Sequence, residues 1–213
     1  MSLKYNSGIF PPEQKELFEI LSKQEWISDF YLAGGTSLAL QIGHRQTIDF
    51  DFFSQKTFDH KSVIKNLKKI GTLEIFHKSE HTINASLNNI KLSFFKYEYP
   101  VLSTFIKTYK MKIAHKLDVA LMKLSAISSR GSKKDFIDLH FLLKDFSLEK
   151  LFEQYKKKYG IGEANGYHLL KSIAYFEDAE HEPMPIMLIP VSWKNIKQSI
   201  INEINKGKYH GKY

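Results

Sequence analysis

The chain has 213 residues, and 43% of them are hydrophobic, which suits one large domain or a small two-lobed one with a buried core. It contains no cysteine, which excludes a disulfide framework and a cysteine-ligated zinc site. The net charge of +8 permits a nucleic-acid partner without showing one, because each lysine run can be the solvated face of a helix.

Neither a membrane span nor an export signal is visible in the sequence. No apolar run approaches the ~20 residues needed to cross a bilayer. Residues 1–10 lack the basic-then-apolar layout of a secretory signal. We therefore expect a cytoplasmic protein with no membrane partner.

The first half of the chain predicts a mixed β-sheet with flanking helices. Apolar spacing indicates a first helix over residues 12–25, and Asp59 is a typical cap for a later helix. Asn88 and Asn89 predict a hairpin turn, because asparagine tolerates a positive φ. The predicted strands are 30–33, 47–53, 72–77, 82–87 and 90–97, with a short helix over 36–42.

From about residue 111 the pattern becomes helical. Leu117, Leu121 and Leu124 have helical spacing, and so do Phe136 and Leu139. Further predicted helices cover residues 148–159, 166–177 and 192–205. We therefore expect an α/β (α+β) fold with an α/β region over 1–110 and a helical region over 111–213, whose ligand site is the cleft between them.

A glycine pair and two hydroxyl residues join one of the predicted strands to the short helix. The Gly34-Gly35 turn lets the backbone come close to a ligand. Thr36 and Ser37 then open the helix, whose free N–H groups and dipole favour an anion. By itself this is a weak signal, because many strand-to-helix turns have similar sequences.

Asp49 and Asp51 share one face of the next predicted strand, because successive side chains alternate. Two like charges side by side are unfavourable without a cation between them. Mg²⁺ binds carboxylate oxygens and keeps positions open for phosphate. An Asp-x-Asp pair is often a solvated strand edge, but the flanking Phe50 and Phe52 argue against full solvation. A phosphate-binding turn beside a pair that holds Mg²⁺, or Mn²⁺ in its place, is the minimal equipment for transferring a nucleotide from an NTP.

The segment from residue 32 to 53 resembles the signature of the AbiEii/AbiGii-type nucleotidyltransferase toxins, which include the MenT toxins. A second segment, residues 121–139, is similar to the family's Lys-Leu-x-Ala, Arg and Lys/Arg-Asp-x-x-Asp-Leu block, and residues 175–180 give a weaker match. The resemblance implies a nucleotidyltransferase-like mixed sheet in the N-terminal half and a helical C-terminal half.

The resemblance also implies roles for charged residues in the second segment. Asp135 and Asp138 lie three apart and share a helix face, and Lys123 and Arg130 share another. From residue types alone, the expected arrangement is a salt bridge between these cations and carboxylates. The resemblance implies instead that Lys123 meets the triphosphate, that Arg130 holds phosphate in a bidentate fork, and that Asp138 acts as base or metal ligand.

Two positions near the aspartate pair leave alternatives open. In the family-like Gly-His-Arg segment, Arg45 either touches a phosphate or braces one of the two aspartates, and His44 is as much a structural as a functional candidate. Nucleotidyltransferases usually place a third carboxylate on a later strand, where the alignment puts Ser93. Serine cannot replace a carboxylate at a second metal, so either Asp138 or Glu98 supplies it, or one metal is held, or catalysis is weak.

We therefore expect a Mg²⁺-dependent nucleotidyltransferase toxin, and the resemblance implies a cognate antitoxin and a role in growth arrest or phage defence. The NTP would donate its NMP to an RNA 3′ end such as that of tRNA, or to a protein side chain. The alternative is a nucleotide- or partner-binding protein of the same fold with weak or no turnover. The predicted catalytic residues are Asp49, Asp51, Lys123 and Asp138, and the predicted nucleotide-binding residues are Gly34, Gly35, Thr36, Ser37, Arg45 and Arg130.

Overall fold

The computed structural model describes residues 5–160 and 163–207 of the chain. Its strands are β1 (Tyr31–Ala33), β2 (Phe50–Ser54), β3 (Leu73–Ser79), β4 (Thr82–Leu87), β5 (Ile90–Lys96), β6 (Ile106–Thr108) and β7 (Met111–Ile113). Its α-helices are α1 (Pro12–Ser22), α2 (Gly34–Ile42), α3 (His60–Lys68), α4 (Lys116–Ser129), α5 (Lys133–Leu142), α6 (Leu148–Tyr159), α7 (Glu163–Ala174), α8 (Glu177–Glu180) and α9 (Trp193–Lys206).

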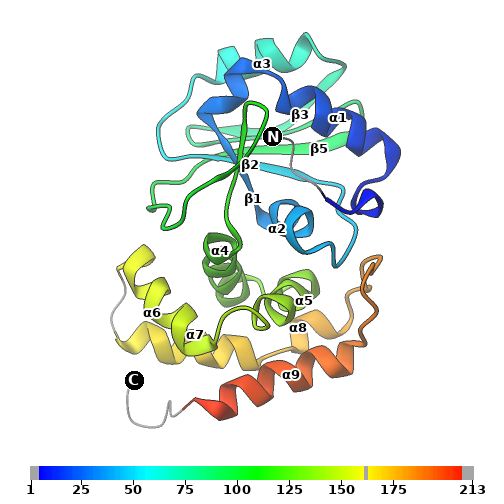
Figure 1. The fold of residues 1–213 in the computed structure, drawn as a ribbon. Helices are drawn as coiled ribbons and strands as arrows, with labels where there is room; N and C mark the ends of the chain where they lie inside the picture. Colours follow the sequence, from blue (N-terminus) through cyan, green and yellow to red (C-terminus); the bar gives the residue numbers. More distant parts are fainter. Residues whose placement is uncertain (1–4, 161–162, 208–213) are drawn as a thin grey trace.

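The described strands form one mixed sheet in the order β3-β4-β5-β2-β1-β7-β6. The neighbours β2/β5 and β1/β7 are parallel, and the other pairs are antiparallel. Helices α1 and α3 cover one face, while α2 and α4 to α9 lie on the other side (Figure 1). The predicted α/β fold with a helical C-terminal half is therefore confirmed.

The side chains of strand β2 alternate between the two faces of the sheet. Phe50 and Phe52 are fully buried and point toward the α1 side, where Phe50 stacks on Phe18 of α1. The alternating Asp51 and Phe53 point to the opposite face, toward α4 and α5. The period-two pattern of the sequence thus places a carboxylate on the side that faces the helical half.

Two local predictions are confirmed by backbone geometry. The Asp59 side chain accepts hydrogen bonds from the backbone N–H groups of Lys61 and Ser62, at 3.0 and 3.2 Å, and caps α3. Asn88 and Asn89 have φ of 50° and 65° in the hairpin that joins β4 to β5. Both features depend on residues close in sequence, which is why the sequence could predict them.

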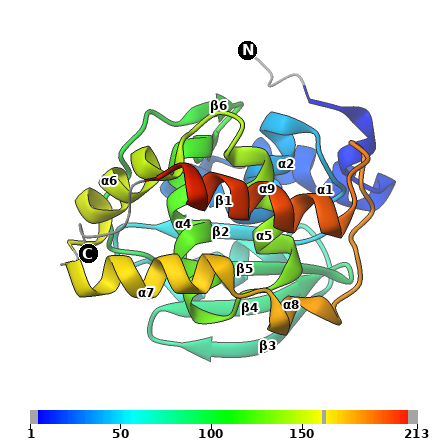
Figure 2. The same cartoon turned by 90° about the horizontal axis from the view of Figure 1, so that it is seen from below.

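The helical half packs its own core against the sheet. Buried side chains of α4, α5, α6, α7 and α9 contact one another and meet Tyr31 and Ala33 of β1. Seen from below, α4, α5 and α9 lie across the middle of the sheet (Figure 2). None of the helices in the described part of the chain is long and apolar enough to cross a membrane.

Several boundaries differ from the predicted ones. The strand predicted over 47–53 begins at Phe50, so Asp49 precedes it, and the helix predicted over 166–177 lies at Glu163–Ala174. Strands β6 and β7 were not predicted, because three residues are too few for a periodic signal. The sheet therefore continues to Ile113, beyond the predicted 110/111 boundary, and residues 208–213 of the predicted helical region lie outside the described residues.

Candidate functional site

The turn between β1 and α2 brings the backbone against two side chains of the site. Gly34 has φ +65°, and a Cβ built there would lie 3.0 Å from Asp51 Oδ2. A Cβ built on Gly35 would collide with the guanidinium group of Arg45. The glycine pair is therefore required by the protein's own side chains, before any ligand is considered.

The predicted carboxylate pair lies at the start of β2. Asp51 is opposite Ala33 in the β1–β2 ladder. Asp49 is held just before the strand by Thr36 Oγ1, which donates to the Asp49 carbonyl oxygen at 2.5 Å. Burial and then the charge of Asp49 raise the pKa of Asp51, although the nearby positive charges oppose this shift. A cation between the two carboxylates would relieve the unfavourable charge.

Ser93 occupies the position beside Asp51 on the neighbouring strand. The two residues are partners in the parallel β2–β5 ladder, and the nearby Ser93 hydroxyl opposes the rise in the pKa of the Asp51 carboxyl group. The sequence alignment placed a serine where nucleotidyltransferases usually have a third carboxylate, and the strand register puts that serine next to the pair.

Neither of the two considered replacements supplies a third carboxylate there. The Glu98 side chain is 73% exposed and pairs with Lys96 at 2.6 Å, and Asp138 is enclosed by cations. Within residues 5–160 and 163–207, no group of three or more His, Asp or Glu side chains is placed to hold a metal ion. Two carboxylates still fit one Mg²⁺, which commonly takes one or two carboxylates and completes its shell with water and phosphate oxygens.

Asp138 is a fully buried anion within a network of cations. Its Oδ1 accepts from His44 Nε2 and Arg45 Nε, both at 2.7 Å. Its Oδ2 accepts from Arg45 Nη2 at 2.9 Å and lies 2.7 Å from Lys123 Nζ. Burial alone would raise the pKa of Asp138, but Arg45, Lys123 and His44 hold it well below its usual range. Both oxygens are engaged, which fits a positioning role better than a role as base or metal ligand.

Asp135 extends this network toward the surface. It accepts from Lys123 Nζ at 2.8 Å, Arg130 Nε at 3.0 Å and Ser132 Oγ at 2.8 Å. Burial alone would lower the pKa of Lys123, but Asp138 and Asp135 raise it. The salt bridges expected from residue types alone are therefore present. The Arg130 side chain is nevertheless 67% exposed, so its remaining N–H groups can meet a phosphate.

One cavity of about 400 Å³ gathers most of the predicted site. Ser37 and Asp138 do not line it: Ser37 is buried on the far side of α2, where its hydroxyl donates to the Ala114 carbonyl oxygen at 2.8 Å. Arg45 lines it while bracing Asp138 and not the aspartate pair. The predicted residues that line the cavity are Gly34, Gly35, Thr36, Arg45, Asp49, Asp51, Lys123 and Arg130.

A segment that the sequence did not single out closes one side of this cavity. We call residues 183–189, between α8 and α9, the strap. Its backbone pairs with the loop after α2, because Gln46 N donates to the Ile186 carbonyl oxygen at 2.8 Å. Ile186, Met184 and Ile48 form an exposed apolar lip on the cavity, with Ile186 65% exposed. Pro183 and Pro185 mark an extended segment in the sequence but do not indicate its partner.

The comparisons with known proteins identify the family of the chain. The model of the nucleotidyl transferase AbiEii toxin family, type IV toxin–antitoxin system, matches residues 15–206. A protein of Aquifex aeolicus (strain VF5), described only as uncharacterised protein aq_aa25, is 41% identical over 176 residues, which cover 80% of this chain and 84% of that protein.

Two solved structures share the fold. JHP933 from Helicobacter pylori has a TM-score of 0.58 at 17% identity, covering 91% of this chain and 90% of that one. MenT4, a nucleotidyltransferase toxin from Mycobacterium tuberculosis H37Rv, has a TM-score of 0.56 at 13% identity, covering 89% of this chain and 81% of that one. At such low identity the likeness concerns the fold alone.

Proposed function

The chain belongs to the nucleotidyl transferase AbiEii toxin family, and from this premise we propose that it transfers an NMP from an NTP to an acceptor hydroxyl with Mg²⁺ or Mn²⁺. The family and the fold support nucleotidyl transfer, and the type IV toxin–antitoxin family suggests an antitoxin partner. The observation that carries the proposal is the placement of Asp49 and Asp51 beside the N-terminus of α2 in one cavity with Lys123 and Arg130.

The cavity offers separate groups for each part of the reaction. The first N–H groups of α2 and the Gly34-Gly35 backbone would bind the triphosphate, and Lys123 and Arg130 would balance its charge. A Mg²⁺ ion held by Asp49 and Asp51 would neutralise phosphate charge and orient the groups for in-line attack.

The transfer exchanges one phosphorus–oxygen bond for another. The acceptor hydroxyl oxygen bonds to the α-phosphorus, the bond from that phosphorus to the β-bridging oxygen breaks, and pyrophosphate leaves. The hydroxyl proton goes to a solvent water, because Asp49 and Asp51 are assigned to the metal and both oxygens of Asp138 are engaged by cations. Asp138 keeps Arg45 and Lys123 in place. The acceptor is an RNA 3′ end, such as that of tRNA, or a protein side chain.

A second candidate is a nucleotide- or partner-binding protein of the same fold with weak or no turnover. Ser93 favours it, because a serine beside Asp51 leaves two carboxylates where three are usual.

Label transfer separates the two candidates. Each NTP, radiolabelled on its α-phosphate, is incubated with Mg²⁺, mixed RNA and the protein. Transfer should be lost in the double variant Asp49→Ala with Asp51→Ala and kept in the matched variant Glu74→Ala with Glu80→Ala, which removes two exposed carboxylates from outside the cavity. Transfer that survives in the aspartate variant contradicts the proposed site. Mg²⁺-dependent NTP binding without any transfer supports the second candidate.

A further inference from the structure

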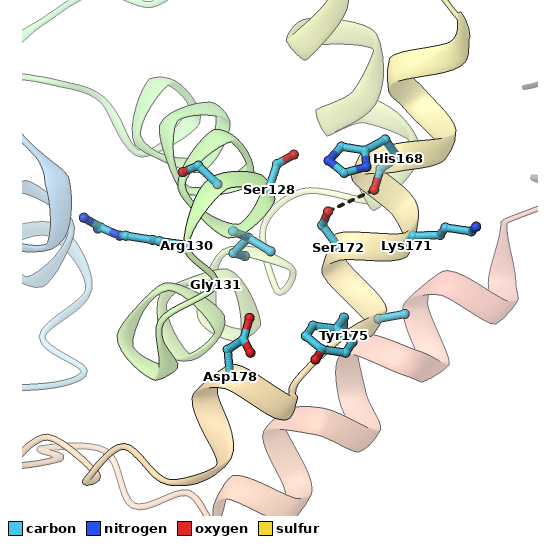
Figure 3. Close-up of a pocket in the computed structure, with 11 residues that line it drawn as sticks. Ser128, Arg130, Gly131, His168, Lys171, Ser172, Tyr175 and Asp178 are labelled. Atoms are coloured by element: carbon cyan, nitrogen blue, oxygen red, sulfur yellow. Dashed lines mark hydrogen bonds between the residues drawn. The ribbon is translucent and has the colours of Figure 1, made fainter.

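A second cavity of about 540 Å³ adjoins the candidate site. It lies between the C-terminal end of α4 and helices α7 and α8, and Arg130 lines both cavities. In Figure 3, the Arg130 side chain extends away from His168 and Tyr175, toward the N-terminal half of the molecule. A ligand in this cavity would therefore reach the candidate site past Arg130.

Three side chains around this cavity, those of Tyr175, His168 and Asp178, are free to bind. Tyr175 is 56% exposed, and neither it nor His168 or Asp178 makes a side-chain hydrogen bond, ion pair or ring contact with any residue of the described ranges. Lys171 has its ammonium group 4.5 Å from the centroid of the Tyr167 ring and is otherwise solvated. An exposed ring, an imidazole and a carboxylate thus share one hollow with several serine hydroxyls, while the charged end of Lys171 points outward from its edge and that of Arg130 points toward the candidate site (Figure 3).

This combination fits a nucleotide of a single strand better than an apolar ligand. Bases stack on exposed aromatic rings, and a backbone phosphate is attracted to Lys and Arg. Asp178 repels phosphate but accepts a hydrogen bond from a base amino group or a ribose hydroxyl. The cavity volume also lies in the range of ordinary ligand sites.

We propose that this cavity binds a nucleotide of a single-stranded RNA acceptor, next to the end that receives the NMP. Tyr175 stacks on its base, and Lys171 at the outer edge of the cavity holds an adjoining phosphate. The inference rests on the proposed function: the NTP needs the aspartate pair and the start of α2, so the second substrate enters from the other side of Arg130.

RNA binding without NTP tests the inference. The probe is a fluorescein-labelled single-stranded RNA of about 12 nucleotides, followed by fluorescence anisotropy at low salt. Loss of the stacking ring in Tyr175→Ala should weaken RNA binding about ten-fold. Lys171→Glu should weaken it as well. The matched variant Tyr109→Ala removes a ring that is 60% exposed but lies in the β6–β7 turn, and it should bind RNA as the unchanged protein does.

NTP binding is read separately, as the Mg²⁺-dependent rise in melting temperature with each NTP. Tyr175→Ala should keep this rise. RNA binding that is absent in the unchanged protein, or equal in Tyr175→Ala and Tyr109→Ala, overturns the inference, as does loss of the NTP response in Tyr175→Ala. The proposed function fails by a different result: NTP responses and label transfer that persist without Asp49 and Asp51.

Discussion

At Gly34 both the backbone conformation and the packing require a glycine. Its φ of +65° is unfavourable for any residue with a Cβ, and the Cβ would also meet the Asp51 carboxylate. Gly35 meets Arg45 in the same way. The sequence-based interpretation of these glycines concerned a ligand, whereas the structure explains them by the side chains that prepare the site.

The raised pKa of Asp51 predicts a pH-dependent cost in stability. A carboxyl group whose pKa is raised by folding stabilises the folded state at low pH, and this contribution is lost as the pH rises and the group ionises. Asp51→Asn cannot ionise, so its free energy of unfolding should exceed that of the unchanged protein at neutral pH. The excess should shrink as the pH falls toward about 4.

Urea denaturation at several pH values measures this difference. Asp29→Asn, which changes an exposed carboxylate outside the cavity, serves as the control and should show no such excess. If the Asp51→Asn protein is no more stable than the unchanged chain at neutral pH, ionised Asp51 does not destabilise the folded state and the prediction is wrong.

Ser93→Asp should convert the pair into a set of three carboxylates. The new group faces Asp51 across the ladder, so in EDTA like-charge repulsion should lower the melting temperature. Mg²⁺ should then raise it by more than in the unchanged protein, because binding to the folded state alone stabilises that state. Ser79→Asp on the exposed strand β3 is the control, and an equal Mg²⁺ response in both variants would argue against a metal site at Asp51.

Between elements, the decisive contact is the one that joins α4 to α5. Lys123 of α4 bonds to Asp135 and Asp138 of α5, and Arg45 reaches Asp138 from the loop after α2. The network is buried and fully hydrogen-bonded at Asp138. It therefore fixes the relative positions of three segments, and the same contacts set the orientation of the cations that line the cavity.

Removing Lys123 should consequently destabilise the fold as well as alter the site. In Lys123→Met the carboxylates of Asp135 and Asp138 lose a buried partner, and breaking a buried pair in this way costs about 3–5 kcal/mol. The free energy of unfolding, from urea denaturation, should fall by that amount. Lys150→Met, which breaks an exposed pair with Glu153, should change it little. A Lys123→Met protein of unchanged stability would mean that Lys123 serves only phosphate.

For the whole molecule, the net charge of +8 overstates the basic surface. Lys123, Lys133 and Lys158 are buried. Lys123 and Lys158 pair with carboxylates, Lys158 with Asp118 at 2.9 Å, and Lys133 donates to the backbone carbonyl oxygens of Glu180 and Glu182. What the surface offers to a polyanion depends on the exposed lysines and on where they lie, and Lys171 adjoins the second cavity.

The salt dependence of RNA binding should therefore depend on where a lysine lies and not on the total charge of the protein. For single strands, the logarithm of affinity falls with that of salt concentration by about 0.7 per phosphate contacted. Lys171→Glu should flatten this slope by about that amount. Lys15→Glu on α1 changes the net charge equally but lies outside both cavities, so its slope should stay as in the unchanged protein. Equal slopes in the two variants would leave only a non-specific role for the charge.

The sequence by itself determined what depends on near neighbours. Alternation along β2 put Asp51 and Phe52 on opposite faces, Asp59 capped α3, and the helical spacing of the second half gave its helices to within a few residues. The glycine turn and the aspartate pair were recognisable because both lie within one short segment. These features follow from local backbone geometry, which the order of residues fixes directly.

Only the tertiary structure decided which distant residues meet. His44 and Arg45 bind Asp138 across 94 and 93 positions of the chain, and the strap pairs with the loop after α2 from more than a hundred positions away. Strands as short as β7 form because β1 offers a partner. No local period encodes such contacts, because their free energy comes from burial and pairing that exist only once the two halves have packed together.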